Sequence, residues 1–167
     1  MKISFILNGE DVSLEADSGL RLVDILRNSF ELRGSKNGCN TGICGTCSVI
    51  LNGELVKSCL VPAFKVRNSE IITFEGFSQT DEYMDFALGF REAGFDNCSF
   101  CMSGKILAAE ALLTRNPRPS RNDILRAFQG TRCRCTGPEN LVRAVTAVIE
   151  HRRRRINEAS SERRFSS

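Results

Sequence analysis

Eight cysteines in two sets of four are the residues whose spacing points to chemistry. The first set has the pattern C-x4-C-x2-C, with a fourth cysteine later in the chain: Cys39, Cys44, Cys47 and Cys59. The second set joins a C-x2-C to a distant C-x-C: Cys98, Cys101, Cys133 and Cys135. Four thiolates can hold a [2Fe–2S] cluster, and the first spacing is that of plant-type ferredoxins. The two sets together predict a pair of one-electron carriers in one chain.

A structural zinc site is the alternative for each set. Zinc sites usually pair two C-x2-4-C knuckles, whereas three cysteines of the first set share one loop. That loop contains Gly38, Gly42 and Gly45, which give the backbone freedom to wrap around a cluster and to turn amides toward sulfur. The first set therefore favours a cluster, while the spacing of the second set leaves zinc open.

The second set is expected just before two helices. Helix N-termini present free amides and a partial positive charge, which both stabilise thiolates. Arg132 and Arg134 flank Cys133 and would partly offset the negative charge of a bound cluster. A helical bundle would bring the two distant cysteine pairs together.

Composition limits the other functions of the chain. The 167 residues suffice for one domain or two small ones. A net charge of +3 is too small to indicate nucleic acid, and we expect no nucleic-acid partner. No apolar run is long enough to cross a membrane, and the apolar start ends at Asn8, too early for a signal peptide. We expect a cytoplasmic protein, in which reduced cysteines favour metal ligation over disulfides.

The first half has the pattern of a small sheet with one helix. The expected order is a hairpin, a helix, a second hairpin and a last strand, at residues 3–16, 22–26, 49–56 and 71–74. Ser18 is the expected N-cap of the helix, and Asn52-Gly53 is a strong hairpin signal. This order predicts a β-grasp domain over residues 1–76.

The second half has helical patterns and no strand signal. Four helices are expected, at residues 83–92, 102–113, 124–128 and 141–148. Ser120 and Asp123 resemble a capping box, and Thr136 is the expected N-cap before Pro138. The sequence therefore predicts a four-helix bundle over residues 77–157, an α+β fold for the whole chain, and a disordered polar tail over residues 158–167.

Both halves, in this order, resemble the iron–sulfur subunit of the molybdenum hydroxylases, the xanthine dehydrogenase and aldehyde oxidoreductase family. The resemblance covers about residues 3–150, and its most specific segments are 38–47 and 133–137. It implies a distal [2Fe–2S] cluster on the first cysteine set and a proximal one on the second. It also implies a large partner subunit that carries molybdopterin and, usually, a medium one that carries FAD.

Several residues around the second set depart from the family pattern. Asn97 replaces the usual glutamine before the first cysteine, and Pro138 replaces a tyrosine. Further departures lie next to the ligands: Ser99, Met102, Ser103, Thr131 and Arg132. None of them replaces a cluster ligand, and all lie on the side that we expect to face the molybdenum subunit.

The hypothesis is an electron-transfer subunit of an oxidoreductase complex, with substrate chemistry on a partner and no catalytic residue in this chain. We expect the substrate to be a purine or another N-heterocycle. A free two-cluster ferredoxin-like carrier and a zinc-stabilised interaction module are the alternatives. The only histidine, His151, opens a basic run over residues 151–155, which is typical of a solvated helix end.

Overall fold

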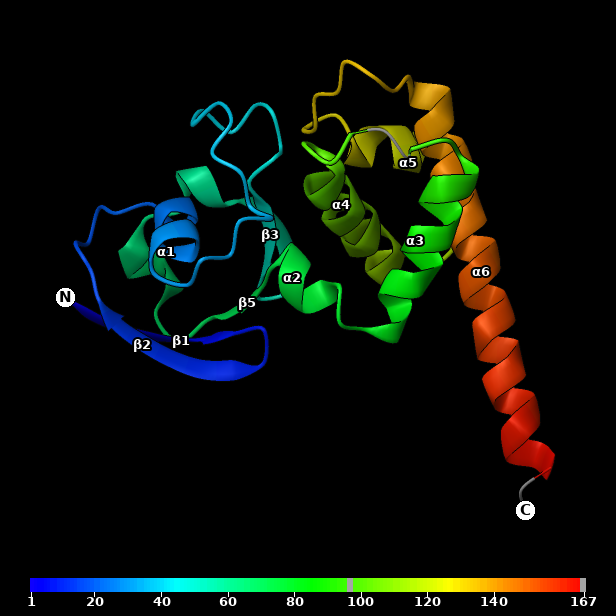
Figure 1. Ribbon diagram of the computed structural model, residues 1–167, viewed down its shortest axis with the longest axis horizontal. Coiled ribbons are helices and arrows are strands. Elements are labelled where there is room, and N and C mark those ends of the chain that lie inside the picture. Colours follow the sequence, from blue (N-terminus) through cyan, green and yellow to red (C-terminus); the bar gives the residue numbers. More distant parts are fainter. Residues whose placement is uncertain (96–97, 166–167) are drawn as a thin grey trace.

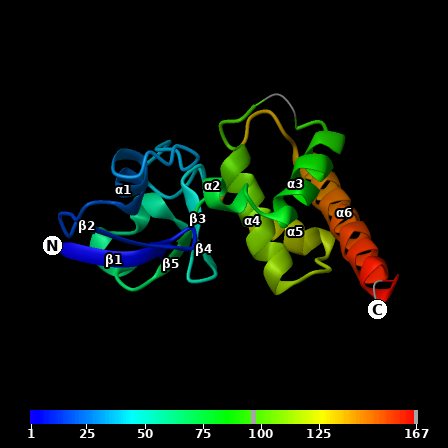
Figure 2. The same ribbon diagram turned by 60° about the horizontal axis from the view of Figure 1, so that its bottom comes forward.

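The computed structural model describes residues 1–95 and 98–165. A sheet domain and a helical domain lie side by side, and the last helix extends beyond the rest of the molecule (Figure 1). The turned view shows the same two parts (Figure 2). No helix in the described part of the chain is long and apolar enough to cross a membrane.

The sheet domain confirms the predicted β-grasp. Its strands lie in the order β2-β1-β5-β3-β4. Their bounds are β1 (Lys2–Leu7), β2 (Glu10–Glu15), β3 (Ser48–Leu51), β4 (Glu54–Lys57) and β5 (Glu70–Ile72). The pairs β1–β2 and β3–β4 are antiparallel hairpins, and β5 pairs parallel to β1. Helix α1 (Leu22–Asn28) and two short 3-10 helices, η1 (Ser58–Leu60) and η2 (Ala63–Val66), complete the domain.

Alternation along β1 builds the core of this domain. Ile3, Phe5 and Leu7 are buried, whereas the residues between them are exposed. The buried side chains pack against the apolar face of α1, including Leu22 and Ile25. Every second residue of the strand thus packs against the apolar face of the helix, whose residues repeat with a period of 3.6.

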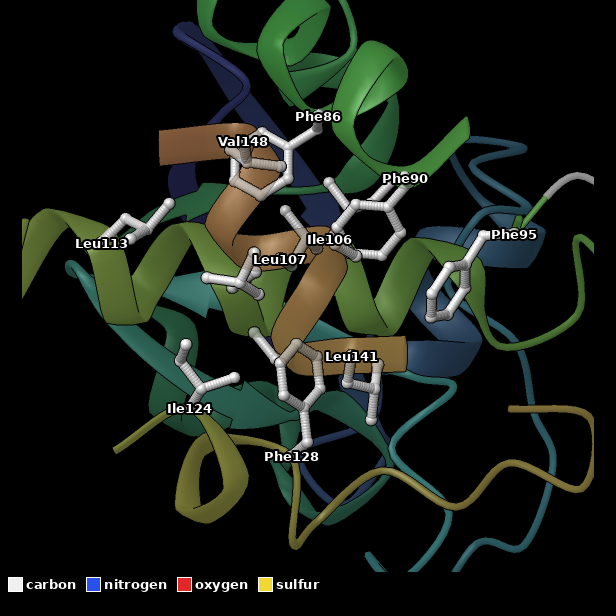
Figure 3. Packing of buried hydrophobic residues seen from close by; sticks show 14 of the residues in the cluster. Phe86, Phe90, Phe95, Ile106, Leu107, Leu113, Ile124, Phe128, Leu141 and Val148 are labelled. Atoms are coloured by element: carbon white, nitrogen blue, oxygen red, sulfur yellow. The ribbon is translucent and has the colours of Figure 1, made fainter. Parts of the chain in front are cut away.

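The helical domain confirms the predicted four-helix bundle. Its helices are α3 (Asp81–Glu92), α4 (Met102–Arg115), α5 (Arg121–Ala127) and α6 (Pro138–Phe165). A short helix, α2 (Phe74–Phe77), links β5 to this bundle. Figure 3 shows Phe86, Phe90 and Phe128 packed between the helices. The predicted boundary after residue 76 falls inside α2, whose Phe77 packs in this helical core.

Two of the three predicted helix N-caps differ from the structure. The capping box is confirmed, since Ser120 accepts from the Asp123 amide and the Asp123 side chain accepts from the Ser120 amide. The Ser18 cap is wrong: α1 begins after Arg21, and Leu22 N–H donates to the Val61 carbonyl at 2.8 Å. Thr136 also lies one residue too early, because α6 begins at Pro138.

The second half of α6 differs from two predictions, one for the polar tail and one for the basic run. Residues 158–165 are helical, where a disordered tail was predicted, because the segment contains no glycine or proline and has mostly polar residues that tolerate a helix. His151 is not a solvated helix end: its side chain is 15% exposed and lies 2.8 Å from Glu92. Arg152 and Arg155 form ion pairs with the buried Asp85 of α3.

Candidate metal centres

The first three cysteines lie in the loop between α1 and β3. The backbone of this loop has positive φ at Asn40, Gly42 and Gly45, with values of 58°, 76° and 75°. A side chain at Gly42 would overlap Leu60 of η1, so the loop lies directly against the segment that carries Cys59. The glycines therefore have the role predicted for them at positions 42 and 45.

Hydrogen bonds lower the pKa of the Cys39 thiol. Cys39 Sγ accepts from the amides of Thr41 and Cys44, each at 3.4 Å. Hydrogen bonds from the side chain and amide of Thr41, and from the Cys44 amide, lower the pKa of Cys39 to about 5. A thiol with this pKa is mostly thiolate at neutral pH, which is the form that binds iron.

The other two thiols of the set are buried. Cys47 and Cys59 pack with Val23 of α1. Burial, followed by a hydrogen bond with Cys47, raises the pKa of Cys59 to about 11. Nearby Lys57 is itself partly buried, and its ammonium donates to Ser48 Oγ at 2.9 Å. The first set thus consists of an outer pair, Cys39 and Cys44, and a buried pair, Cys47 and Cys59.

The second set surrounds a cavity in the helical domain. The cavity has a volume of about 120 Å³, and all four cysteines line it together with Lys105 and Thr136. Cys101 immediately precedes α4, and the C-x-C segment precedes α6. The bundle therefore brings together cysteines more than thirty positions apart, as the sequence predicted.

The thiols around this cavity have unequal acidities. Burial raises the pKa of Cys101. Burial also disfavours the Cys133 thiolate, but hydrogen bonds from Lys105, Thr136 and the Cys135 amide outweigh it and lower the pKa of Cys133 to about 6. The nearby charges of Cys98 and Cys133 raise the pKa of Cys135. The Cys133 side chain contributes to the raised pKa of Cys101, and the side chains of Cys98 and Cys133 contribute to that of Cys135, so all four thiols of this set lie close together.

The thiols of the second set fit a binuclear cluster. A [2Fe–2S] cluster distributes its four cysteine ligands over two irons. The donor type, the number of donors around one cavity and the cavity size are therefore compatible with such a cluster.

The two cysteine loops touch each other. Arg132 N–H donates to the Cys44 carbonyl at 3.0 Å, and the Lys36 ammonium donates to the Ser99 carbonyl at 3.2 Å. The carbonyl oxygen of Gly45 lies against Gly104 of α4, so that a Cβ at Gly104 would overlap it, and a Cβ at Gly45 would overlap the carbonyl oxygen of Gly130. No feature of the cysteine spacing predicted this contact, which places the two sites side by side.

The residues that depart from the family pattern have several environments. Ser103 is buried, and its hydroxyl donates to the Gly34 carbonyl at 2.7 Å, so it faces the sheet domain and corrects the expectation that it faces a partner. Thr131 is also buried and lies beside Gly45 of the sheet domain. Met102 is half-buried and Pro138 begins α6. Asn97 lies outside the described residues.

Sequence reasoning missed Lys105 and the role of Thr136. Lys105 follows Cys101 by four residues, so both project from one side of the same helical turn. The only lysine of α4 lies among small and apolar residues, and this position could have indicated a buried lysine. Thr136, expected to cap α6, instead contributes to the lowered pKa of Cys133.

Two family models match the chain. One, described as a 2Fe-2S iron-sulfur cluster binding domain, matches residues 5–70. The other, described as a [2Fe-2S] binding domain, matches residues 73–146. The two matched ranges are therefore each similar to a domain that binds an iron–sulfur cluster.

Curated relatives and solved structures match nearly the whole chain. The nicotinate dehydrogenase small FeS subunit of Eubacterium barkeri is 40% identical, over 89% of this chain and 94% of its own length. The aldehyde oxidoreductase of Megalodesulfovibrio gigas is 39% identical over 83% of this chain, which corresponds to 16% of that longer protein. The structure of quinoline 2-oxidoreductase from Pseudomonas putida 86 matches with a TM-score of 0.84 and 36% identity, covering 92% of this chain and 96% of that one.

Proposed function

The chain belongs to the family of small iron–sulfur subunits of molybdenum hydroxylases, and we propose that it carries electrons from a molybdopterin-binding large subunit to a FAD-binding medium subunit. The observation that carries this proposal is the direct contact between the two cysteine loops. Carriers in series must lie close together, and this contact supports such an order. When bound, each cluster accepts and passes on a single electron.

We assign the ligands by cysteine set. The distal cluster is held by the first set: Cys39, Cys44, Cys47 and Cys59. The proximal cluster is held by the second set: Cys98, Cys101, Cys133 and Cys135. The grouping of the second set around one cavity supports this assignment, as does the low pKa of one thiol in each set. Burial of Cys47, Cys59 and Cys101 keeps water away from one side of each site.

The surface beside the second set supports its orientation toward the molybdenum subunit. An open groove of about 980 Å³ runs past Cys98, Cys133 and Cys135. Phe100 lines the groove with 54% of its surface exposed. A partner that covers this groove would exclude water from the cysteines and shorten the path for an electron. The first set then faces the medium subunit.

An N-heterocycle is the substrate class that we propose for the complex, with purines among its members. The names of two matched proteins refer to nicotinate and quinoline, which both contain a ring nitrogen. An aldehyde is the competing class, given the match to an aldehyde oxidoreductase. Substrate binding would be the task of the large subunit.

Purification of the intact complex tests the function. We expect the chain to co-purify with a molybdenum subunit and a flavin subunit, and to contain about four irons and four sulfides per copy. A chain that purifies alone with this iron content would instead be a free carrier. A colourless chain that contains zinc would be a zinc-stabilised interaction module, and either result would contradict the proposal.

A further inference from the structure

Lys105 is buried inside the helical domain. Only 1% of its surface is exposed, although lysine is among the residues least often fully buried. It lies in the first turns of α4, surrounded in sequence by Gly104, Ile106 and Leu107, which are also buried. Burying an ammonium group is costly unless a negative partner compensates for the lost hydration.

The surroundings of Lys105 identify that partner. Its Nζ lies 4.8 Å from the centre of the Phe95 ring, an arrangement that attracts a cation only weakly. The side chain lines the same 120 Å³ cavity as the four cysteines of the second set. The Lys105 charge favours the thiolate of Cys101 and lowers the pKa of Cys133, one cysteine from each half of the set. Among the described residues, the thiolates of this cavity are thus the anionic groups beside the lysine.

We propose that Lys105 is a positioning residue that raises the reduction potential of the cluster in the helical domain. This inference rests on the proposed function, because it requires a cluster in the cavity. Reduction adds one electron and therefore one negative charge to the cluster, while no bond of the lysine forms or breaks. A fixed ammonium beside two ligand sulfurs stabilises the reduced form more than the oxidised form, and net charge and hydrogen bonds to sulfur both tune the potentials of such clusters.

Burial makes this charge effective. Exposed charges are screened by water and salt, whereas charges inside a protein interact through a lower effective dielectric constant. Arg132 and Arg134, which the sequence suggested as the compensating charges, are both exposed. The buried lysine therefore has the larger influence on the second set. With a higher potential, this cluster accepts electrons from the molybdenum centre more readily.

The test compares Lys105→Met with Arg115→Met in the complete complex. Methionine keeps an unbranched apolar side chain, one atom shorter than lysine, and removes the ammonium with its charge and donors. Arg115 carries the same formal charge on the same helix, ten residues and about 15 Å further along, where it is exposed. The two cluster signals are titrated separately by electron paramagnetic resonance, with the cluster of the sheet domain as a reference inside each sample.

In Lys105→Met we expect the potential of the helical-domain cluster to fall by at least about 59 mV, which is a tenfold change in the reduced-to-oxidised ratio of a one-electron couple. The cluster of the sheet domain should keep its potential, and Arg115→Met should move neither. An unchanged potential in Lys105→Met, with both clusters present, would overturn the inference and leave the proposed function intact. An unaltered chain that binds no iron would instead contradict the proposed function.

A second measurement decides the case in which Lys105→Met loses its cluster. The chain is labelled with 15N-lysine, and Lys36→Met removes the other lysine that contacts the second set's loop, through Ser99. A 15N hyperfine coupling at the reduced helical-domain cluster would support the inference, because it requires an ammonium next to a ligand sulfur. The absence of that coupling would overturn it.

Discussion

Individual thiols in both cysteine sets have pKa values that differ widely before any metal is bound. Hydrogen bonds lower the pKa of Cys39 to about 5, whereas burial raises the pKa of Cys59 to about 11. The same contrast separates Cys133 from Cys101 in the second set. One thiol of each set is therefore ready to bind iron at neutral pH, and the buried thiol must lose its proton as the metal binds.

Thiol reactivity in the metal-free chain should follow these pKa values. A lowered pKa means that the thiolate persists as the pH falls, until the pH reaches the lowered value. We expect iodoacetamide to modify Cys39 at a rate that is constant above about pH 6 and falls toward pH 5. Cys59 should react only as the pH rises toward 11. Peptide mass spectrometry after timed labelling measures both rates, and equal pH profiles would contradict the assigned environments.

Loss of one ligand should remove one cluster. In Cys44→Ser we expect the iron content to fall by about half and the chain to unfold at a lower temperature, because the cluster links the loop to the sheet. Ile43→Ser is the matched control, since Ile43 is 50% exposed and adjacent in the loop. Iron analysis, together with calorimetry, separates the two variants. A Cys44→Ser chain with full iron and normal stability would remove Cys44 from the ligand set.

At the scale of elements, local signals predicted the structure where no distant segment intervened. The capping box at Ser120 is confirmed because both of its partners lie within four residues. The start of α1 was wrong because a distant segment sets it: Arg21 bridges to Pro62. Spacing predicted which cysteines form each set, whereas the burial of Lys105 depends on the packing of the bundle and was not predicted.

The close approach of α3 and α6 depends on Gly89. A Cβ at this position would lie 2.6 Å from the Val148 backbone nitrogen, so the helices must separate to admit a methyl group. We expect Gly89→Ala to reduce the free energy of unfolding by about 1–3 kcal/mol, the usual cost of overpacking. Gly19→Ala is the control, because its Cβ would meet only Asp17 Oδ1 at 3.4 Å. Chemical denaturation measures both, and equal stabilities would contradict the packing.

At the scale of the whole molecule, the contact between Gly45 and Gly104 joins the two domains through main-chain atoms. The hydrogen bonds Arg132–Cys44 and Ser103–Gly34 lie around it. Each domain alone is small for a protein of independent stability. The interface therefore contributes to the stability of both domains, and they should unfold together.

A larger side chain at this contact should separate their unfolding. We expect a single calorimetric transition for the unaltered chain and two transitions for Gly104→Val, because valine overlaps the Gly45 carbonyl. In Gly137→Val the single transition should persist, since nothing lies within 4 Å of a Cβ there. Weaker magnetic coupling between the two reduced clusters should accompany the split transition. A single transition in Gly104→Val would show that the domains are held together elsewhere.

The absence of side chains at the Gly45–Gly104 contact has a consequence for the timing of electron movement. Rotamer changes alter many distances inside proteins within nanoseconds. Two backbones in direct contact have no such freedom. The tunnelling distance between the two sites therefore varies little with thermal motion, and the transfer rate within this chain should depend on driving force far more than on temperature-dependent fluctuation.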